Sequence, residues 1–195
     1  MTLTEKHIEY ENDCRKMFVG QIIRGVIYGE IKHNIDDNGN NIDPKPYYNT
    51  KYQEIDTLDY SIYFKTDEKT IYLFWDNTFI CYGIKSKQIV LTDNTNDYEQ
   101  KWDVSFDTKW IDFIGQKITN FKIDWLETCA SNLDGTNKVY TTYPQTFTIM
   151  IDNQKTIIVT ASELIRPDEK EVFHLMDNLL ITTNMNLARQ LKMIS

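Results

Sequence analysis

Near the start of the chain stands Phe18-Val19-Gly20-Gln21-Ile22-Ile23, and a similar pattern returns near the middle as Phe113-Ile114-Gly115-Gln116-Lys117-Ile118. Each copy places an aromatic residue, an aliphatic residue, a glycine and a glutamine in the same order. A glycine suits the end of a helix or a tight turn, because it adopts positive φ angles without steric cost. The repeat therefore marks two equivalent starting points within one chain.

The segments that follow each copy also correspond. They are 62–67 with 147–152, 70–73 with 156–159, and 88–94 with 178–184. Three landmarks in the same order predict a degenerate tandem duplication, with repeats of about 18–105 and 113–194. Two β units that each have one apolar face bury those faces best against each other. We therefore expect a single domain that spans residues 1–195.

Local patterns predict the elements of this domain. Residues 4–18 predict a helix, since apolar side chains recur on one side of it. Alternating apolar residues predict strands in both repeats, with hairpin turns at 66–69 and 152–154. Residues 186–193 predict a short terminal helix, and the polar segment 93–107 is interpreted as a linker. The fold class predicted is α+β, mostly β, with internally duplicated antiparallel β units, an N-terminal helix and a short C-terminal helix.

Composition places the chain among globular proteins with a net negative charge. Hydrophobic residues make up 41% and charged residues 26%, and the formal net charge is −8 with a pI near 4.9. Binding to nucleic acid or to an anionic membrane needs clustered Lys and Arg, so neither partner is expected. An acidic surface favours encounter with a basic protein partner.

The cysteines and the chain start indicate a reducing compartment. Cys14, Cys81 and Cys129 are widely separated and form no CxxC motif. Buried, reduced thiols are the interpretation of this pattern, rather than disulfides or a zinc site. The first residues are charged and lack the apolar run of a signal peptide, and no apolar run reaches transmembrane length. We expect a cytoplasmic protein.

The longest polar stretch, residues 34–57, is the candidate functional segment. Pro44 and Pro46 disfavour a helix or a central strand there, and loops of this length are often functional. Acidic residues alternate with tyrosines, which suits a protein interface with a basic partner. The alternative is that the tyrosines pack as lids on the edge of a sheet. The counterpart loop in the second repeat, residues 128–145, is shorter. The predicted partner-binding residues are Asp36, Asp37, Asp43, Tyr47, Tyr48, Tyr52, Glu54 and Asp56.

No motif for catalysis, metal binding or phosphate binding appears in the sequence. A partial calcium-loop pattern begins at Asn34, but Lys45 stands where a bidentate Glu is required. We therefore expect no metal, no cofactor and no catalytic residue. An enzyme or small-ligand protein would instead need a cleft between the repeats, lined by Glu30, Asp76 and aromatic residues such as Trp75 and Trp125.

The chain resembles the immunity proteins of bacterial polymorphic or contact-dependent toxin systems. The resemblance lies in its small size, acidity, β-rich and motif-poor character, and in the segments 113–118 and 177–181. It implies a non-enzymatic binding protein that neutralises a cognate toxin by direct binding. A toxin with a basic active site, such as a nuclease, would suit the charge. The alternative is a small-ligand-binding protein or a hydrolase-type enzyme with a cleft between the repeats.

Overall fold

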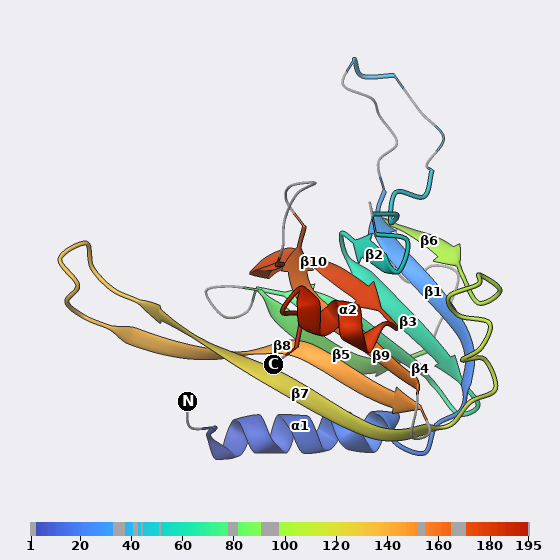
Figure 1. Cartoon of the computed structure of the whole chain (residues 1–195), viewed down its shortest axis with the longest axis horizontal. Coiled ribbons are helices and arrows are strands. Elements are labelled where there is room, and N and C mark those ends of the chain that lie inside the picture. Colours follow the sequence, from blue (N-terminus) through green and yellow to red (C-terminus); the bar gives the residue numbers. More distant parts are fainter. Residues whose placement is uncertain are drawn as a thin grey trace.

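A computed structural model gives the fold of the chain (Figure 1). It describes residues 3–32, 38–40, 43, 45–50, 52–77, 82–90, 98–151, 155–164 and 171–194. Two five-stranded antiparallel sheets and two helices make up these parts, so the predicted α+β, mostly β fold class is confirmed. The helices are α1 (Glu5–Phe18) and α2 (Met185–Gln190).

The first sheet has the strand order β5-β4-β3-β1-β6. Its strands are β1 (Ile23–Ile31), β3 (Ser61–Thr66), β4 (Thr70–Asp76), β5 (Gly83–Ile89) and β6 (Glu99–Asp103). The second sheet has the order β2-β10-β9-β8-β7. Its strands are β2 (Ile55–Leu58), β7 (Ile118–Ala130), β8 (Val139–Ile151), β9 (Lys155–Glu163) and β10 (Phe173–Thr182). Strand β2 comes from the first half of the chain, and it pairs with β10 of the second half.

The two copies of the repeated segment pair with each other in a reciprocal way. The backbone N–H of Gly20 donates to Ile118 O at 2.8 Å, and that of Gly115 donates to Ile23 O at 2.7 Å. The N–H of Ile23 donates to Gln116 O at 3.0 Å, and that of Ile118 donates to Gln21 O at 2.8 Å. Each bond therefore has a counterpart in which the two copies exchange roles, as around a local twofold axis.

The equivalence extends into the strands that follow. Both glycines have positive φ angles, 92° at Gly20 and 83° at Gly115. Strand β1 shifts register between Ile23 and Gly25, and β7 shifts register at the matching place, between Ile118 and Asn120. Each unit then forms a meander, β1-β3-β4-β5 in one and β7-β8-β9-β10 in the other. The single-domain organisation with repeats of about 18–105 and 113–194 stays a prediction.

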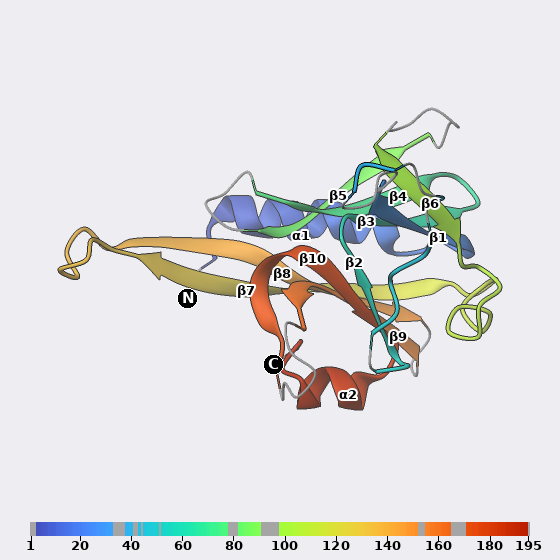
Figure 2. The same cartoon turned by 90° about the horizontal axis from the view of Figure 1, so that it is seen from above.

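The sheets face each other across one core, which α1 closes along one side (Figures 1 and 2). Phe18, at the end of α1, stacks on Phe121 of β7 at 4.9 Å and meets Phe64 of β3 edge-on at 6.1 Å. The hydroxyl of Tyr10 donates to Ile84 O of β5 at 3.1 Å. The helix therefore contacts an outer strand of each sheet.

Helix α2 covers the outer face of the second sheet (Figure 2). Leu187, Ala188 and Leu191 pack there against Ile158 of β9 and Leu180 of β10. Asn184 is the N-cap, and its side chain accepts hydrogen bonds from the backbone N–H groups of residues 186 and 187, both at 3.0 Å. A polar cap and an apolar face thus make a short helix stable on a sheet.

Gly20 and Gly115 occupy equivalent positions in the two paired copies, so substituting each of them gives a matched test of the local twofold symmetry. No atom lies within 4 Å of a Cβ added at Gly20 or at Gly115, so Gly→Ala costs only the positive φ angle. We expect G20A and G115A each to lower the free energy of unfolding by about 1–2 kcal/mol. Chemical denaturation measures both values. A large loss in one variant beside no loss in the other would contradict the equivalence of the two positions.

Candidate functional site

The structure places the predicted partner-binding residues in different surroundings. Asp36 and Asp37 lie outside the described residues. Asp43 and Glu54 are exposed, whereas Asp56 is buried. The structure brings Tyr47, Tyr48 and Asp56 together near the end of β1, and it places Tyr52 and Glu54 beside α2. The first group contacts Tyr28, Glu30, Ile31 and Asp59, and Glu54 of the second group contacts Asn184.

Tyr47 is held by hydrogen bonds at the end of β1. Its hydroxyl donates to Ile31 O at 3.0 Å and to the carboxylate of Asp59. Its backbone N–H donates to Glu30 Oε1 at 3.3 Å. The side chain is still 41% exposed, so the ring is fixed in place and open to solvent on one side. A rigid aromatic ring with an exposed face suits a protein contact.

Glu30 lies beneath this tyrosine as a buried carboxylate. Trp102 of β6 donates its indole N–H to Glu30 Oε2 at 2.5 Å. Burial raises the pKa of Glu30 from 4.5 to about 7, and the hydrogen bonds from Trp102 and Tyr47 oppose that rise. The alternative enzyme hypothesis paired Glu30 with Asp76, but β3 separates their strands and Asp76 forms an ion pair with Lys85 at 2.9 Å.

Asp56 belongs to a buried chain of polar contacts. Trp110 donates its indole N–H to the Tyr28 hydroxyl at 2.7 Å, and that hydroxyl donates to Asp56 Oδ2 at 2.6 Å. Lys109 Nζ lies 2.6 Å from Asp56 Oδ1. Tyr48 packs edge-on against Tyr28, with ring centroids 5.0 Å apart. Both oxygens of Asp56 thus have partners inside the protein, so we assign this residue a structural role.

Tyr52 and Glu54 support the second sheet at α2. Tyr52 packs against the apolar cluster beneath that helix, as the alternative of tyrosines packed as lids anticipates. Glu54 Oε1 accepts a hydrogen bond from Asn184 Nδ2 at 2.8 Å, at the N-cap of α2. This contact ties the segment before β2 to the C-terminal helix.

A two-stranded ribbon projects from the body at the end of β7 and β8 (Figure 1). Pairing of β7 with β8 continues to Ala130 and Val139, whereas pairing of β8 with β9 ends at Thr146. Residues 131–140 are all exposed. The segment 128–145 was expected to be a loop, and most of it instead forms these strands. The run of β-branched and aromatic residues in 139–143 was the signal that could have indicated a strand.

The ribbon carries apolar side chains into solvent and is fastened at its base. Leu133 is fully exposed, and Val139 and Tyr140 are 54% and 61% exposed. At the base, Trp125 donates its indole N–H to Glu11 of α1 at 3.2 Å. The ring of His7 lies 4.8 Å from the Trp125 ring. The start of α1 thus holds the ribbon base, while its tip has no layer of described residues over it.

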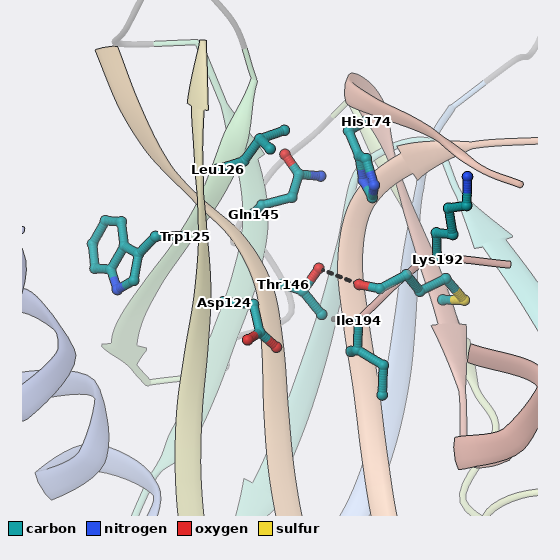
Figure 3. A pocket seen from close by; sticks show the side chains of 9 residues that line it. Asp124, Trp125, Leu126, Gln145, Thr146, His174, Lys192 and Ile194 are labelled. Carbon is teal, nitrogen blue, oxygen red and sulfur yellow. Dashed lines mark hydrogen bonds between the residues drawn. The ribbon is translucent and has the colours of Figure 1, made fainter. Parts of the chain in front are cut away.

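A pocket of about 330 Å³ lies beside the ribbon base (Figure 3). Strands β7 and β8 form one wall, and β10 and the turn after α2 form the other. The pocket lies within the second unit. Of the residues named for the cleft, Trp125 lines this pocket, whereas Glu30, Trp75 and Asp76 do not. A cleft between the repeats was the expectation of the alternative hypothesis, so this pocket is a different site. Its lining includes Asp124, Leu126, Gln145, His174, Met193 and Ile194.

Removal of the Asp56 carboxylate should show its structural role. We expect Asp56→Ala to lower the free energy of unfolding by about 3–5 kcal/mol, because Lys109 would remain buried without its partner. Asp13→Ala is the matched control, since its ion pair with Lys16 is exposed, and there we expect a loss below about 1 kcal/mol. Urea denaturation at pH 7 measures both. Equal effects of the two substitutions would contradict the structural assignment of Asp56.

The raised pKa of Glu30 predicts a pH dependence of stability. Between pH 4.5 and about 7 the folded protein holds a proton on Glu30 that the unfolded chain has lost. The stability contributed by this group is therefore complete below pH 4.5 and is lost as the pH rises through 7. Glu30→Gln removes this dependence, so from pH 4.5 to 8 its stability relative to the parent should rise by about 3 kcal/mol.

Denaturation curves at pH 4.5, 6 and 8 measure that difference. Glu127→Gln, an exposed charge removal on the ribbon, controls for the change in net charge. A difference between Glu30→Gln and the parent that stays constant with pH would show that Glu30 titrates normally.

Within the described ranges, no group of three or more His, Cys, Asp or Glu side chains is placed to hold a metal ion. Neither of the two helices there has the length and apolar character needed to cross a membrane. Comparison of the chain with protein-family models, with curated proteins and with solved structures found no match.

Proposed function

We propose that this chain is a non-enzymatic binding protein that recognises a basic protein partner, and that it acts as an immunity or inhibitor protein that neutralises a toxin by direct binding. The projecting ribbon is the observation that carries the proposal. The resemblance to immunity proteins supplies the toxin as partner, and the acidic charge of the chain agrees with a basic one.

The ribbon has the properties of a contact element. A two-stranded ribbon alone is marginally stable in water, and here nothing described packs on its distal half. Its cost is offset when a partner covers the exposed side chains of Leu133, Val139 and Tyr140. The exposed end of β8 at Val139 and Tyr140 lies outside the range that pairs with β9, and it gives a partner an edge to which it can add a strand.

Charge on the ribbon favours a basic partner. Between residues 124 and 145 the acidic residues are Asp124, Glu127 and Asp134, and the basic residue is Lys138. The whole chain, ribbon included, has a formal net charge of −8, which accelerates encounter with a positively charged protein. Partner binding is therefore expected to slow as salt is raised.

Part of the acidic tyrosine segment forms a second candidate contact. Tyr47 presents a fixed and partly exposed ring, and Asp43 and Glu54 are exposed. These three remain predicted partner contacts, as do Asp36 and Asp37. We do not include Asp56, because its oxygens are engaged by Tyr28 and Lys109.

Co-expression with the product of the adjacent gene tests the function. We expect a stoichiometric complex by size exclusion, and rescue of host growth if that product is toxic. Leu133→Ser and Tyr140→Ser should each raise the dissociation constant of the complex at least tenfold. Each should change the free energy of unfolding by less than about 0.5 kcal/mol. Phe106→Ser is the matched control, since Phe106 is 85% exposed and lies outside the ribbon.

Two results would reject the proposal. Absence of a stable complex with any toxin of the host would remove the inhibitor function. Ribbon variants that bind the partner as tightly as Phe106→Ser does would remove the ribbon as the contact element.

A further inference from the structure

The pocket at the ribbon base contains a buried acceptor that no described group satisfies. Gln145 is 3% exposed. Its Nε2 donates to Ala161 O, and lies 3.3 Å from Thr160 Oγ1 and 3.2 Å from Ser162 Oγ. Its Oε1 is buried without a hydrogen-bond partner. Ala161 O is an acceptor, so the NH₂ end of the Gln145 amide must face it. Turning the amide over would place two oxygens against each other. An unsatisfied buried acceptor costs about 1–3 kcal/mol.

The donors of the pocket are already engaged. Thr146 donates its hydroxyl to Met193 O at 2.8 Å, and this bond is drawn in Figure 3. His174 Nδ1 lies 3.0 Å from Ser162 Oγ. Burial lowers the pKa of His174, so its ring is neutral near pH 7. The ammonium of Lys192 points away from the pocket and pairs with Glu171.

Asp124 supplies the charge on the wall that β7 and β8 form, the same wall as Gln145. Its Oδ1 accepts from Lys122 Nζ at 2.5 Å, and its Oδ2 has no hydrogen bond to a described residue. The free polar groups of the pocket are therefore acceptors, Gln145 Oε1 and Asp124 Oδ2. The lining also includes apolar side chains, Leu126 of β7 and Ile194 after α2 (Figure 3). Such a lining fits a donor group on an apolar stem.

Backbone strain gathers at the same place. Leu175, next to His174, and Lys192 both have positive φ angles, 62° and 56°. Strand β10 jumps in register from the pair His174–Ser162 to the pair Leu179–Ala161, so four residues bulge out directly after His174. Positive φ costs a residue with a Cβ about 1–2 kcal/mol. Strain of this kind clusters at ligand sites.

We propose that this pocket receives a lysine or arginine side chain of the protein partner, with its cationic group on Asp124 and Gln145 and its methylene stem on Leu126 and Ile194. That this cation belongs to a protein partner rests on the proposed function. The volume of about 330 Å³ is at the lower end of ligand pockets, which suits one side chain. A buried charged anchor is also a common centre of binding energy.

Small probes test the pocket without the partner. The ¹⁵N-labelled full-length chain is titrated with n-butylguanidinium and n-butylammonium, and with neutral n-butylurea as the comparison. We expect saturable shifts of the Gln145 side-chain amide and of the Met193 N–H with the two cations. Asp124→Asn should weaken cation binding at least fivefold. Glu127→Gln, on the same strand but outside the pocket, should leave it unchanged.

The partner complex tests the source of the cation. Asp124→Asn should weaken that complex at least tenfold. Glu9→Gln, an exposed charge removal on α1 outside both the pocket and the ribbon, should weaken it by less than threefold. The proposal is overturned if neither cation gives saturable shifts, or if n-butylurea binds as tightly as n-butylguanidinium. Cation binding beside an unaffected complex would overturn the partner side chain as occupant. Failure to form any complex counts against the proposed function alone, because the probe titration still decides the pocket.

Discussion

The reciprocal backbone pairing between the segments that begin at Phe18 and Phe113 is the constraint on which the rest of the structure depends. It fixes the starts of β1 and β7 against each other, and each strand then enters a different sheet. Because both segments turn at a glycine with positive φ, the two strands leave the seam in equivalent ways. The sheets consequently face each other with their apolar sides inward. Phe18, Phe64 and Phe121 fill the space beside the seam.

Aromatic side chains serve this fold as hydrogen-bond donors as well as apolar bulk. Several buried or half-buried carboxylates each accept a hydrogen bond from a Tyr hydroxyl or a Trp indole N–H. These pairs are Tyr28 with Asp56, Trp102 with Glu30, Tyr63 with Glu99 and Trp125 with Glu11. A buried carboxylate without such donors would be strongly unfavourable. Much of the Tyr and Trp content that suggested an interface is therefore engaged inside the protein.

The sequence predicted those elements whose apolar periodicity and end signals lie in residues close together along the chain. The helix predicted over 4–18 begins at Glu5 and ends at Phe18. The two predicted hairpins correspond to the antiparallel pairs β3–β4 and β8–β9. Strand β6 was missed, because Glu99–Asp103 is polar and its buried residue is the charged Glu99. Phe106, which lies in the segment interpreted as a linker, is 85% exposed. Membership of β2 in the second sheet was also out of reach, since it depends on pairing with residues far along the chain.

The site was less predictable than the fold for the same physical reason. The polar and acidic composition of 34–57 located Tyr47 and Asp43 correctly on the surface, yet it could not show that Lys109 and Tyr28 enclose Asp56. The ribbon was hidden because its strands lack an apolar face, which is what a strand outside any core should lack. Long-range contacts decide both outcomes, and no local pattern records them.

One register shift connects the ribbon to the pocket. Thr146 pairs with Asp124 and Pro144 pairs with Trp125, so Gln145 is an extra residue in β8. An extra residue bends a strand and redirects the side chains around it. Here Trp125 packs on the α1 side, while Asp124 and Gln145 line the pocket on the other. The strands leave the body from this same point. The partner that we propose for the ribbon would therefore also reach the mouth of the pocket.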